Sequence, residues 1–194
     1  MSIIVAVRKG DTAVIGADTA ESEDDLVISA DYIVNHSKLL RAGDSVLGMA
    51  GWSATQHIIE SVVRSKAVEL NFSSGADIFE TSRKLHEVMK SDYFMDPQEE
   101  KEQPVESSQI SALIVNPSGI FELESYRSVA QYTKFWAIGS GKRLAIGAMH
   151  AAYDVLDDAS AIAEAGMRAA CQFDDGCSLP LEMVSVPLAP SHPL

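Results

Sequence analysis

The sequence is poor in cysteine and in positive charge. Its 194 residues include two cysteines, 15 lysines and arginines, and 28 aspartates and glutamates, which gives a formal net charge of −13 at pH 7. Cys171 and Cys177 have no histidines at metal-ligand spacing around them, which argues against a disulfide scaffold and a zinc site. The acidic balance argues against a nucleic-acid partner, because phosphate backbones repel a negative surface.

Long hydrophobic runs are also missing. Near the start of the chain the longest apolar run is Ile3–Val7, and Arg8 and Lys9 follow it, which is the reverse of a signal peptide. No stretch of eighteen apolar residues occurs, so we expect no membrane segment and no membrane partner. Together with the low cysteine content, this predicts a cytoplasmic protein.

Cofactor motifs are absent as well. The five histidines show no ligand spacing, and neither a G-x-S-x-G elbow nor a phosphate-binding glycine loop occurs, since Gly139-Ser140-Gly141 is too short for one. The acidic pairs at 157–158 and 174–175 are typical of residues that flank helices. We therefore expect neither a metal nor an organic cofactor.

The apolar pattern predicts groups of strands that alternate with pairs of helices. With 46% hydrophobic residues, the chain is expected to form one domain over 1–194, with an irregular, proline-containing tail at 187–194. In order we expect strands at 3–9, 12–17, 26–34, 38–41 and 45–50, helical periodicity over 58–70 and 78–89, an acidic surface loop at 92–108, strands at 110–115, 120–124 and 135–138, helices over 144–156 and 159–172, and a strand at 181–186. This order predicts an α/β (α+β) fold, a four-layer αββα sandwich of two mainly antiparallel sheets between two helix layers.

Ser2 is the most informative single residue. One methionine precedes it, and the apolar run that follows is expected to be a strand. If Met1 is removed, one residue carries both a hydroxyl and a free α-amino group, and an α-amine with a pKa near ~7.7–8 can accept the hydroxyl proton. Met-Ser is also a common way for a protein to begin, so the dipeptide alone does not identify a nucleophile.

A series of motifs, in this order, resembles the proteasome β-type family, and the bacterial HslV peptidases in particular. They are Ser2–Gly10, Ile15-Gly16-Ala17-Asp18, Ser37-Lys38-Leu39-Leu40, Gly48-Met49-Ala50-Gly51, Ala137-Ile138-Gly139-Ser140-Gly141 and Ala169–Asp174. The resemblance spans residue 2 to about residue 187. It implies the fold of N-terminal nucleophile (Ntn) hydrolases and a threonine/serine-type endopeptidase that acts on peptides or unfolded proteins. It also implies a homo-oligomeric ring, a hexamer or heptamer that can stack as a double ring, and an ATPase unfoldase as partner.

The resemblance implies catalytic roles for three residues. Ser2 would attack the scissile carbonyl with its own amine as base, and Lys38 would lower the pKa of that amine by its charge. Asp18 would be the counter-ion of Lys38, so that losing either has the same effect. The residues alone leave other interpretations open: Lys38 as an ordinary charge at a strand end, and Asp18 as a turn residue.

Three further residues would support the reaction. Gly51 would supply the backbone N–H of the oxyanion hole, or it only forms a tight turn between a strand and a helix. Ser140 and Asp174 would orient the amine of Ser2. Their alternatives are a helix cap for Ser140 and a turn residue at a helix end for Asp174.

The resemblance also implies the residues that line the substrate cleft. They are Ala20, Glu21, Ser22, Met49 and Ser53. An acidic loop at 21–25 in that position would prefer basic side chains, but a solvated acidic surface explains the same charges. Met49 would be an adaptable pocket residue or an ordinary core residue.

Two departures from the family pattern keep other functions open. Ser2 stands where the family usually has threonine, and Cys177 falls near a position where the family has a serine bonded to the amine. A thiol is the weaker hydrogen-bonding group. The alternatives are a proteasome-like shell with little or no peptidase activity and an amidase of the same nucleophile class that acts on a small molecule.

Overall fold

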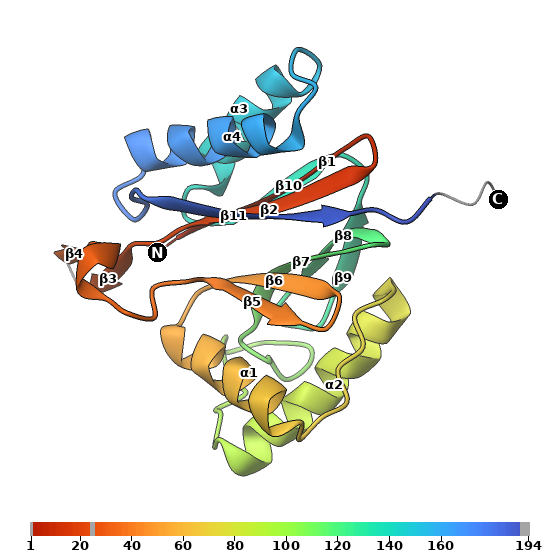
Figure 1. Cartoon of the computed structure of the whole chain (residues 1–194). Helices are drawn as coiled ribbons and strands as arrows, with labels where there is room; N and C mark the ends of the chain where they lie inside the picture. Colours follow the sequence, from red (N-terminus) through yellow and green to blue (C-terminus); the bar gives the residue numbers. More distant parts are fainter. Residues whose placement is uncertain (1, 24–25, 191–194) are drawn as a thin grey trace.

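Two β-sheets lie face to face between two pairs of helices (Figure 1). The computed structural model describes residues 2–23 and 26–190. The order of layers is helices, sheet, sheet, helices, and every strand pair in both sheets is antiparallel. This arrangement confirms the predicted four-layer αββα sandwich.

The first sheet contains the start of the chain. Its strands, in spatial order, are β10 (Phe135–Gly139), β1 (Ile3–Lys9), β2 (Thr12–Asp18) and β11 (Leu181–Pro187). Helices α3 (Lys142–Tyr153) and α4 (Ala159–Phe173) cover its outer face. Side chains alternate along β1: Ile3, Val5 and Val7 pack toward these helices, whereas Ile4 and Ala6 pack toward the second sheet. As a result, β1 is buried on both faces.

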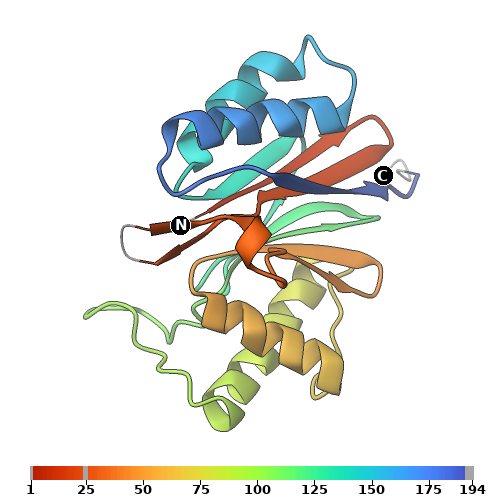
Figure 2. The same ribbon diagram turned by 60° about the vertical axis from the view of Figure 1, so that its left-hand side comes forward.

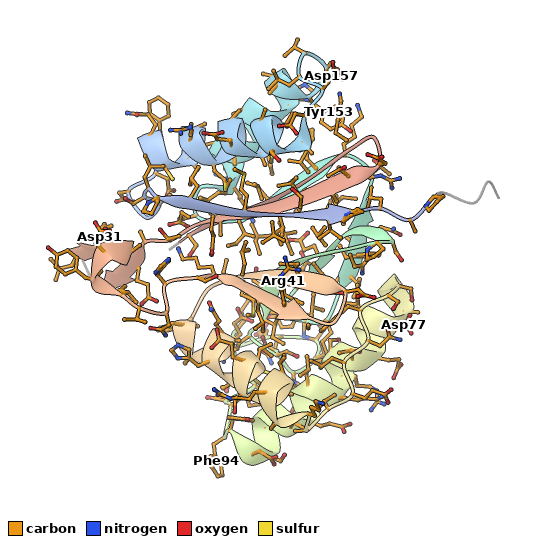
Figure 3. The ribbon with its side chains drawn as sticks, in the orientation of Figure 1. Asp31, Arg41, Asp77, Phe94, Tyr153 and Asp157 are labelled. Atoms are coloured by element: carbon orange, nitrogen blue, oxygen red, sulfur yellow. The ribbon has the colours of Figure 1, made fainter. Side chains whose placement is uncertain are left out.

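The second sheet joins the first through a shared apolar layer (Figure 3). Its strands, in spatial order, are β5 (Leu39–Ala42), β6 (Ser45–Ala50), β7 (Ser111–Asn116), β8 (Gly119–Leu123) and β9 (Val129–Tyr132). Helices α1 (Ser53–Ser65) and α2 (Gly75–Asp92) cover its other face. None of the helices in the described ranges is long and apolar enough to cross a membrane.

A small hairpin lies beside the two sheets. It consists of β3 (Glu21–Glu23) and β4 (Leu26–Ile28), and a short 3₁₀ helix, η1 (Ala30–Tyr32), follows it. The sequence predicted a loop at 21–25 and one extended segment at 26–34. Residues 21–23 form a strand instead of a loop, and within the predicted extended segment Leu26–Ile28 is a strand whereas Ala30–Tyr32 is helical. The strands of this hairpin are specified by pairing with each other and not by a buried face. Asp24 and Asp25 of the predicted loop lie outside the described residues.

Other boundaries also differ from the predictions. β9 was missed, because it is a short edge strand without a buried residue. The first helix lies earlier in the chain than the predicted range 58–70: α1 begins at Ser53 and ends at Ser65, and Lys66 has a left-handed backbone that stops it. α3 likewise ends at Tyr153, before the end of its predicted range. Pro187 belongs to β11 rather than to the tail, and residues 191–194 of the tail lie outside the described residues.

A long polar segment, residues 93–110, connects α2 to β7. It extends toward the same side of the molecule as the start of the chain (Figure 2). The Glu106 carboxylate anchors it by accepting hydrogen bonds from Lys90 Nζ at 2.6 Å, while His86 Nε2 lies 2.9 Å from the same carboxylate. The hydrogen bond from Lys90, followed by that from His86, lowers the pKa of Glu106 from 4.5 to about 2.

The Glu106 anchor predicts a dependence of stability on pH. A carboxyl group whose pKa is lowered in the folded state stabilises the protein above its ordinary pKa, and this contribution is lost as the pH falls from about 4.5 toward 2. We expect Glu106→Gln to reduce the loss of unfolding temperature over that pH range. The exposed Glu102 on the same segment offers a matched control: in Glu102→Gln the unfolding temperature should depend on pH as in wild type. If the unfolding temperatures of Glu106→Gln and wild type fell equally between pH 4.5 and 2, the stabilising role of Glu106 would be contradicted.

Candidate active site

A cleft at one end of the two sheets collects most of the residues that the sequence singled out. Eight of the eleven line it: Ser2, Ala20, Glu21, Ser22, Lys38, Met49, Gly51 and Ser53. They come from the start of β1, the hairpin strand β3, the residues before β5, the end of β6 and the start of α1. The other three do not line it: Asp18 contacts Lys38, Ser140 contacts Ser2, and Asp174 contacts Ser140.

Asp18 is the last residue of β2, and its side chain is fully buried. Its Oδ1 atom accepts hydrogen bonds from Lys38 Nζ at 2.8 Å and from the backbone N–H of Ile3 at 2.9 Å. Its Oδ2 atom accepts a longer bond from the N–H of Ser178 at 3.4 Å. The Lys38 side chain is only 9% exposed. The two residues therefore form a buried ion pair next to Ser2. The alternatives, an ordinary strand-end charge for Lys38 and a turn residue for Asp18, do not describe this arrangement.

A second polar cluster lies next to the carbonyl group of Ser2. It consists of Ser140, Asp174 and Cys177. Ser140 Oγ donates to Asp174 Oδ1 at 2.9 Å and lies 3.4 Å from the carbonyl oxygen of Ser2. Cys177 Sγ donates to the same Asp174 oxygen at 3.3 Å. The N-cap of α3 is Gly141, without a side-chain bond, so Ser140 is not a helix cap. Asp174 is the C-cap of α4, as the alternative of a residue at a helix end predicted, and it also contacts Ser140.

Cys177 contributes a buried thiol to this cluster. Burial, and then the hydrogen bond to Asp174, raise the pKa of Cys177 to about 12. The group therefore remains a neutral thiol at physiological pH, which donates to Asp174 and is a poor nucleophile. Burial also raises the pKa of Cys171 to about 11.

Two glycines near the site have backbone conformations that other residues rarely adopt. Gly139 pairs with Ile3 at the end of β10 and has a φ of +97°. A Cβ atom at Gly139 would lie 2.1 Å from the carbonyl oxygen of Ser2. Gly51 lies exposed between β6 and α1 with a φ of +116°, so it forms the turn that the sequence predicted and also lines the cleft.

The residues expected to contact substrate differ in exposure. Ala20 and Met49 are buried, with 2% and 7% of their surface exposed, and Met49 also packs in the core beneath the second sheet. Met49 therefore lines the cleft and is also a core residue, while its contact with substrate stays a prediction. Glu21 and Ser22 are half-buried, and Ser53 is exposed.

Glu182 is a neighbour of the site that the sequence analysis missed. Its two carboxylate oxygens accept hydrogen bonds from Ser37 Oγ at 2.8 Å and from the N–H of Lys38 at 2.7 Å. The signal for it in the sequence is an acidic residue inside the strand predicted at 181–186. Within the described part of the chain, no three His, Cys, Asp or Glu side chains are grouped so that they could hold a metal ion.

Because the backbone of Gly139 passes so close to Ser2, even a methyl side chain at position 139 should strongly destabilise the folded protein. We expect Gly139→Ala to lower the free energy of unfolding by about 2–4 kcal/mol, because the strand end must move and the left-handed backbone is strained. Chemical denaturation measures this. Gly147→Ala in α3 is the control, since a Cβ there meets nothing within 4 Å, and it should change stability by about 1 kcal/mol or less. Equal stability of the two variants would show that the contact at Gly139 has been misread.

The buried pair predicts coupled losses of stability. Asp18→Asn and Lys38→Met should each cost about 3–5 kcal/mol, because each leaves the partner's charge buried without compensation. The double variant should lose less than the sum of the two, since it removes both charges. Denaturant unfolding of the four proteins forms the double-mutant cycle. Simple additivity would mean that the two side chains do not interact.

Comparison with known proteins gives a consistent family assignment. The family model for proteasome subunits matches residues 2–177, a range that contains all eleven predicted site residues. A search of curated proteins gives no match. Two structures of BPH from Thiobacillus denitrificans, one in complex with epoxomicin, are 36% identical to this chain, cover 97% of it and 100% of their own chain, and have a TM-score of 0.90.

The eukaryotic HslV from Trypanosoma brucei shares the fold. It is 23% identical, covers 95% of this chain and 99% of its own, and has a TM-score of 0.68. The two sheets between helix layers match the fold of Ntn hydrolases. The predicted resemblance to the proteasome family is confirmed, and the chain belongs to the proteasome subunit family.

Proposed function

We propose that this protein cleaves peptide bonds with Ser2 as its N-terminal nucleophile, after removal of Met1. Membership of the proteasome subunit family supports a peptidase at the level of the family. The observation that carries the assignment to Ser2 is its position in the cleft beside Lys38, whose ammonium group is bonded to the buried Asp18. Met1 itself lies outside the described residues.

The reaction would proceed through an ester. Ser2 Oγ attacks the carbonyl carbon of the scissile bond, and the α-amine of Ser2 takes the hydroxyl proton directly or through a water molecule. The negative oxygen that develops accepts a hydrogen bond from the N–H of Gly51. The C–N bond then breaks, and the leaving amine takes the proton from the α-ammonium group. Water, deprotonated by the same amine, hydrolyses the ester and restores Ser2.

The buried pair would set the protonation state of the α-amine. A cation close to an amine disfavours the protonated amine and lowers its pKa, so Lys38 increases the fraction of Ser2 that is ready to act as a base. Asp18 supplies the counter-ion that a buried ammonium group requires. The cluster of Ser140, Asp174 and Cys177 would orient Ser2 through its carbonyl group and amine.

The substrate would be a peptide or an unfolded protein segment that lies in the cleft. Ala20, Met49 and Ser53 would contact one side chain next to the scissile bond, and Glu21 and Ser22 would contact the extended peptide at its edge. Met49 makes the pocket adaptable rather than selective, because a thioether side chain is flexible.

The assembly proposed for this protein is a homo-oligomeric ring, a hexamer or heptamer that can stack as a double ring, with an ATPase unfoldase as a further partner. Family membership supports an assembly of this kind. The hairpin β3–β4 and η1 project beside the sheets (Figure 1). The hairpin, η1 and the residues just after it expose several large apolar side chains. These are Leu26, Val27, Tyr32 and Val34. Exposed apolar side chains of this number are typical of surfaces that contact another protein.

The proposal predicts the chemistry at Ser2. Intact mass spectrometry should show protein without Met1, and incubation with epoxomicin or another hydroxyl-directed peptide inhibitor should give a complex that depends on Ser2. Ser2→Ala should reduce peptide hydrolysis by about 10³-fold or more, because it removes the nucleophile. Ser2→Thr should retain hydrolysis, because it keeps the hydroxyl and the amine.

Ser111→Ala is the matched control, since Ser111 also lines the cleft but has no role in this reaction. It should hydrolyse peptides and bind the inhibitor like wild type. Retention of Met1 in protein from a host that processes methionine would overturn the mechanism. Undiminished hydrolysis by Ser2→Ala would overturn the choice of nucleophile. A processed protein without peptide hydrolysis would favour the shell or the small-molecule amidase.

A further inference from the structure

The segment that carries Lys38 lies just outside the second sheet. β5 begins at Leu39, one residue later, and the carbonyl group of Lys38 accepts a hydrogen bond from the N–H of Met49 in β6 at 3.2 Å. The N–H of Lys38 is not bonded by a strand of the same sheet: it donates to the carboxylate of Glu182. The preceding residues Val34 and Asn35 are exposed and give this segment little support. The position of Lys38 therefore depends on contacts from other elements.

Glu182 provides such a contact from the first sheet. It lies on β11, opposite Ala17 of β2, and its neighbour Leu181 is opposite Asp18. One carboxylate thus accepts bonds from two consecutive residues, Ser37 and Lys38, at 2.8 and 2.7 Å. Hydrogen bonds to a charged acceptor are stronger than those between neutral groups. The carboxylate connects the two sheets at the same place as the ion pair.

The two connections hold different parts of Lys38. Asp18, on β2 of the first sheet, fixes the Nζ atom, whereas Glu182, on β11 of the same sheet, fixes the backbone N–H. A lysine side chain has a flexible four-carbon stem, so the ammonium position is defined only when both ends are held. Gln56 of α1 adds a third contact, because its Nε2 atom donates to the carbonyl group of Ser37 at 2.7 Å.

We propose that Glu182 is a positioning residue of the active site, which holds the Ser37–Lys38 backbone so that the Lys38 ammonium group stays between Asp18 and the amine of Ser2. This inference rests on the proposed function. Glu182 is not among the described residues that line the cleft, and the described partner of Lys38 Nζ is Asp18. Glu182 therefore acts through the backbone of Lys38 and does not touch the substrate or replace the counter-ion.

The test compares variants at position 182 by steady-state peptide hydrolysis against pH. Glu182→Ala should lower kcat about 10- to 100-fold, because a shift of about 1 Å in a positioned group has an effect of this size. Its KM should change little. The acid limb of its pH profile should move to higher pH, because the amine loses the nearby cation and its pKa rises toward the ordinary value of ~7.7–8.

Glu182→Gln separates hydrogen bonding from charge. Its amide oxygen can accept from the N–H of Lys38, and its amide nitrogen can donate to Ser37 Oγ, so both contacts survive without the charge. This variant should keep the wild-type pH profile and a kcat within about threefold of wild type. Ser185→Ala, at an exposed site on the same strand, is the control for a change in β11 and should behave like wild type. If kcat fell as much in Glu182→Gln as in Glu182→Ala, positioning by hydrogen bonds would be overturned. A wild-type kcat and pH profile in Glu182→Ala would overturn the proposal entirely.

Hydrogen exchange measured by mass spectrometry tests the anchor without relying on activity. The peptide that contains Ser37 and Lys38 should exchange faster in Glu182→Ala than in wild type or Glu182→Gln, and unchanged exchange would overturn the proposal. If the wild-type protein hydrolyses no peptide, the proposed function fails while the exchange experiment still decides whether Glu182 holds the segment. If Glu182→Ala does not fold, Glu182→Asp replaces it. Its carboxylate is one methylene shorter and should produce the same shift in pH profile and exchange, and wild-type behaviour in both would overturn the proposal.

Discussion

The buried carboxylate of Asp18 is the contact on which the rest of the site depends. It accepts hydrogen bonds from the backbone of Ile3, from the side chain of Lys38 and from the backbone of Ser178. These three groups belong to the first strand, to the segment just before β5 of the second sheet and to the segment before the last strand. A buried carboxylate requires several donors, since each unsatisfied lone pair costs free energy. The need to satisfy one charge thus brings three distant parts of the chain to the same point.

The layered fold could be predicted from local patterns. β1 and β2 are apolar runs around a turn at Gly10, and α2 and α4 have helical periodicity between recognisable ends, so their existence follows from short stretches of sequence. β9 and the hairpin β3–β4 could not be found in this way. Neither has a buried apolar stripe, and each forms because a partner strand is placed beside it.

The site could be predicted only in part, for a related reason. The order of motifs identified Ser2, Lys38 and Gly51, which the fold brings into one cleft. It did not identify Glu182, because that residue contacts Lys38 across 144 positions of the chain and no local pattern reports such a contact. Motif order indicates which residues carry the chemistry. The groups that hold them in place become visible only when the two sheets are packed together.

The complete burial of β1 has a consequence for the lifetime of the site. A residue near the end of a chain ordinarily samples open conformations far more often than the core does. Here Ser2 heads a strand whose first five residues have no exposed surface, and this strand is shared by two apolar layers. Releasing Ser2 would require β1 to leave both layers, which amounts to unfolding the molecule. The geometry around Ser2 is therefore expected to be completed during folding and to persist for as long as the protein stays folded.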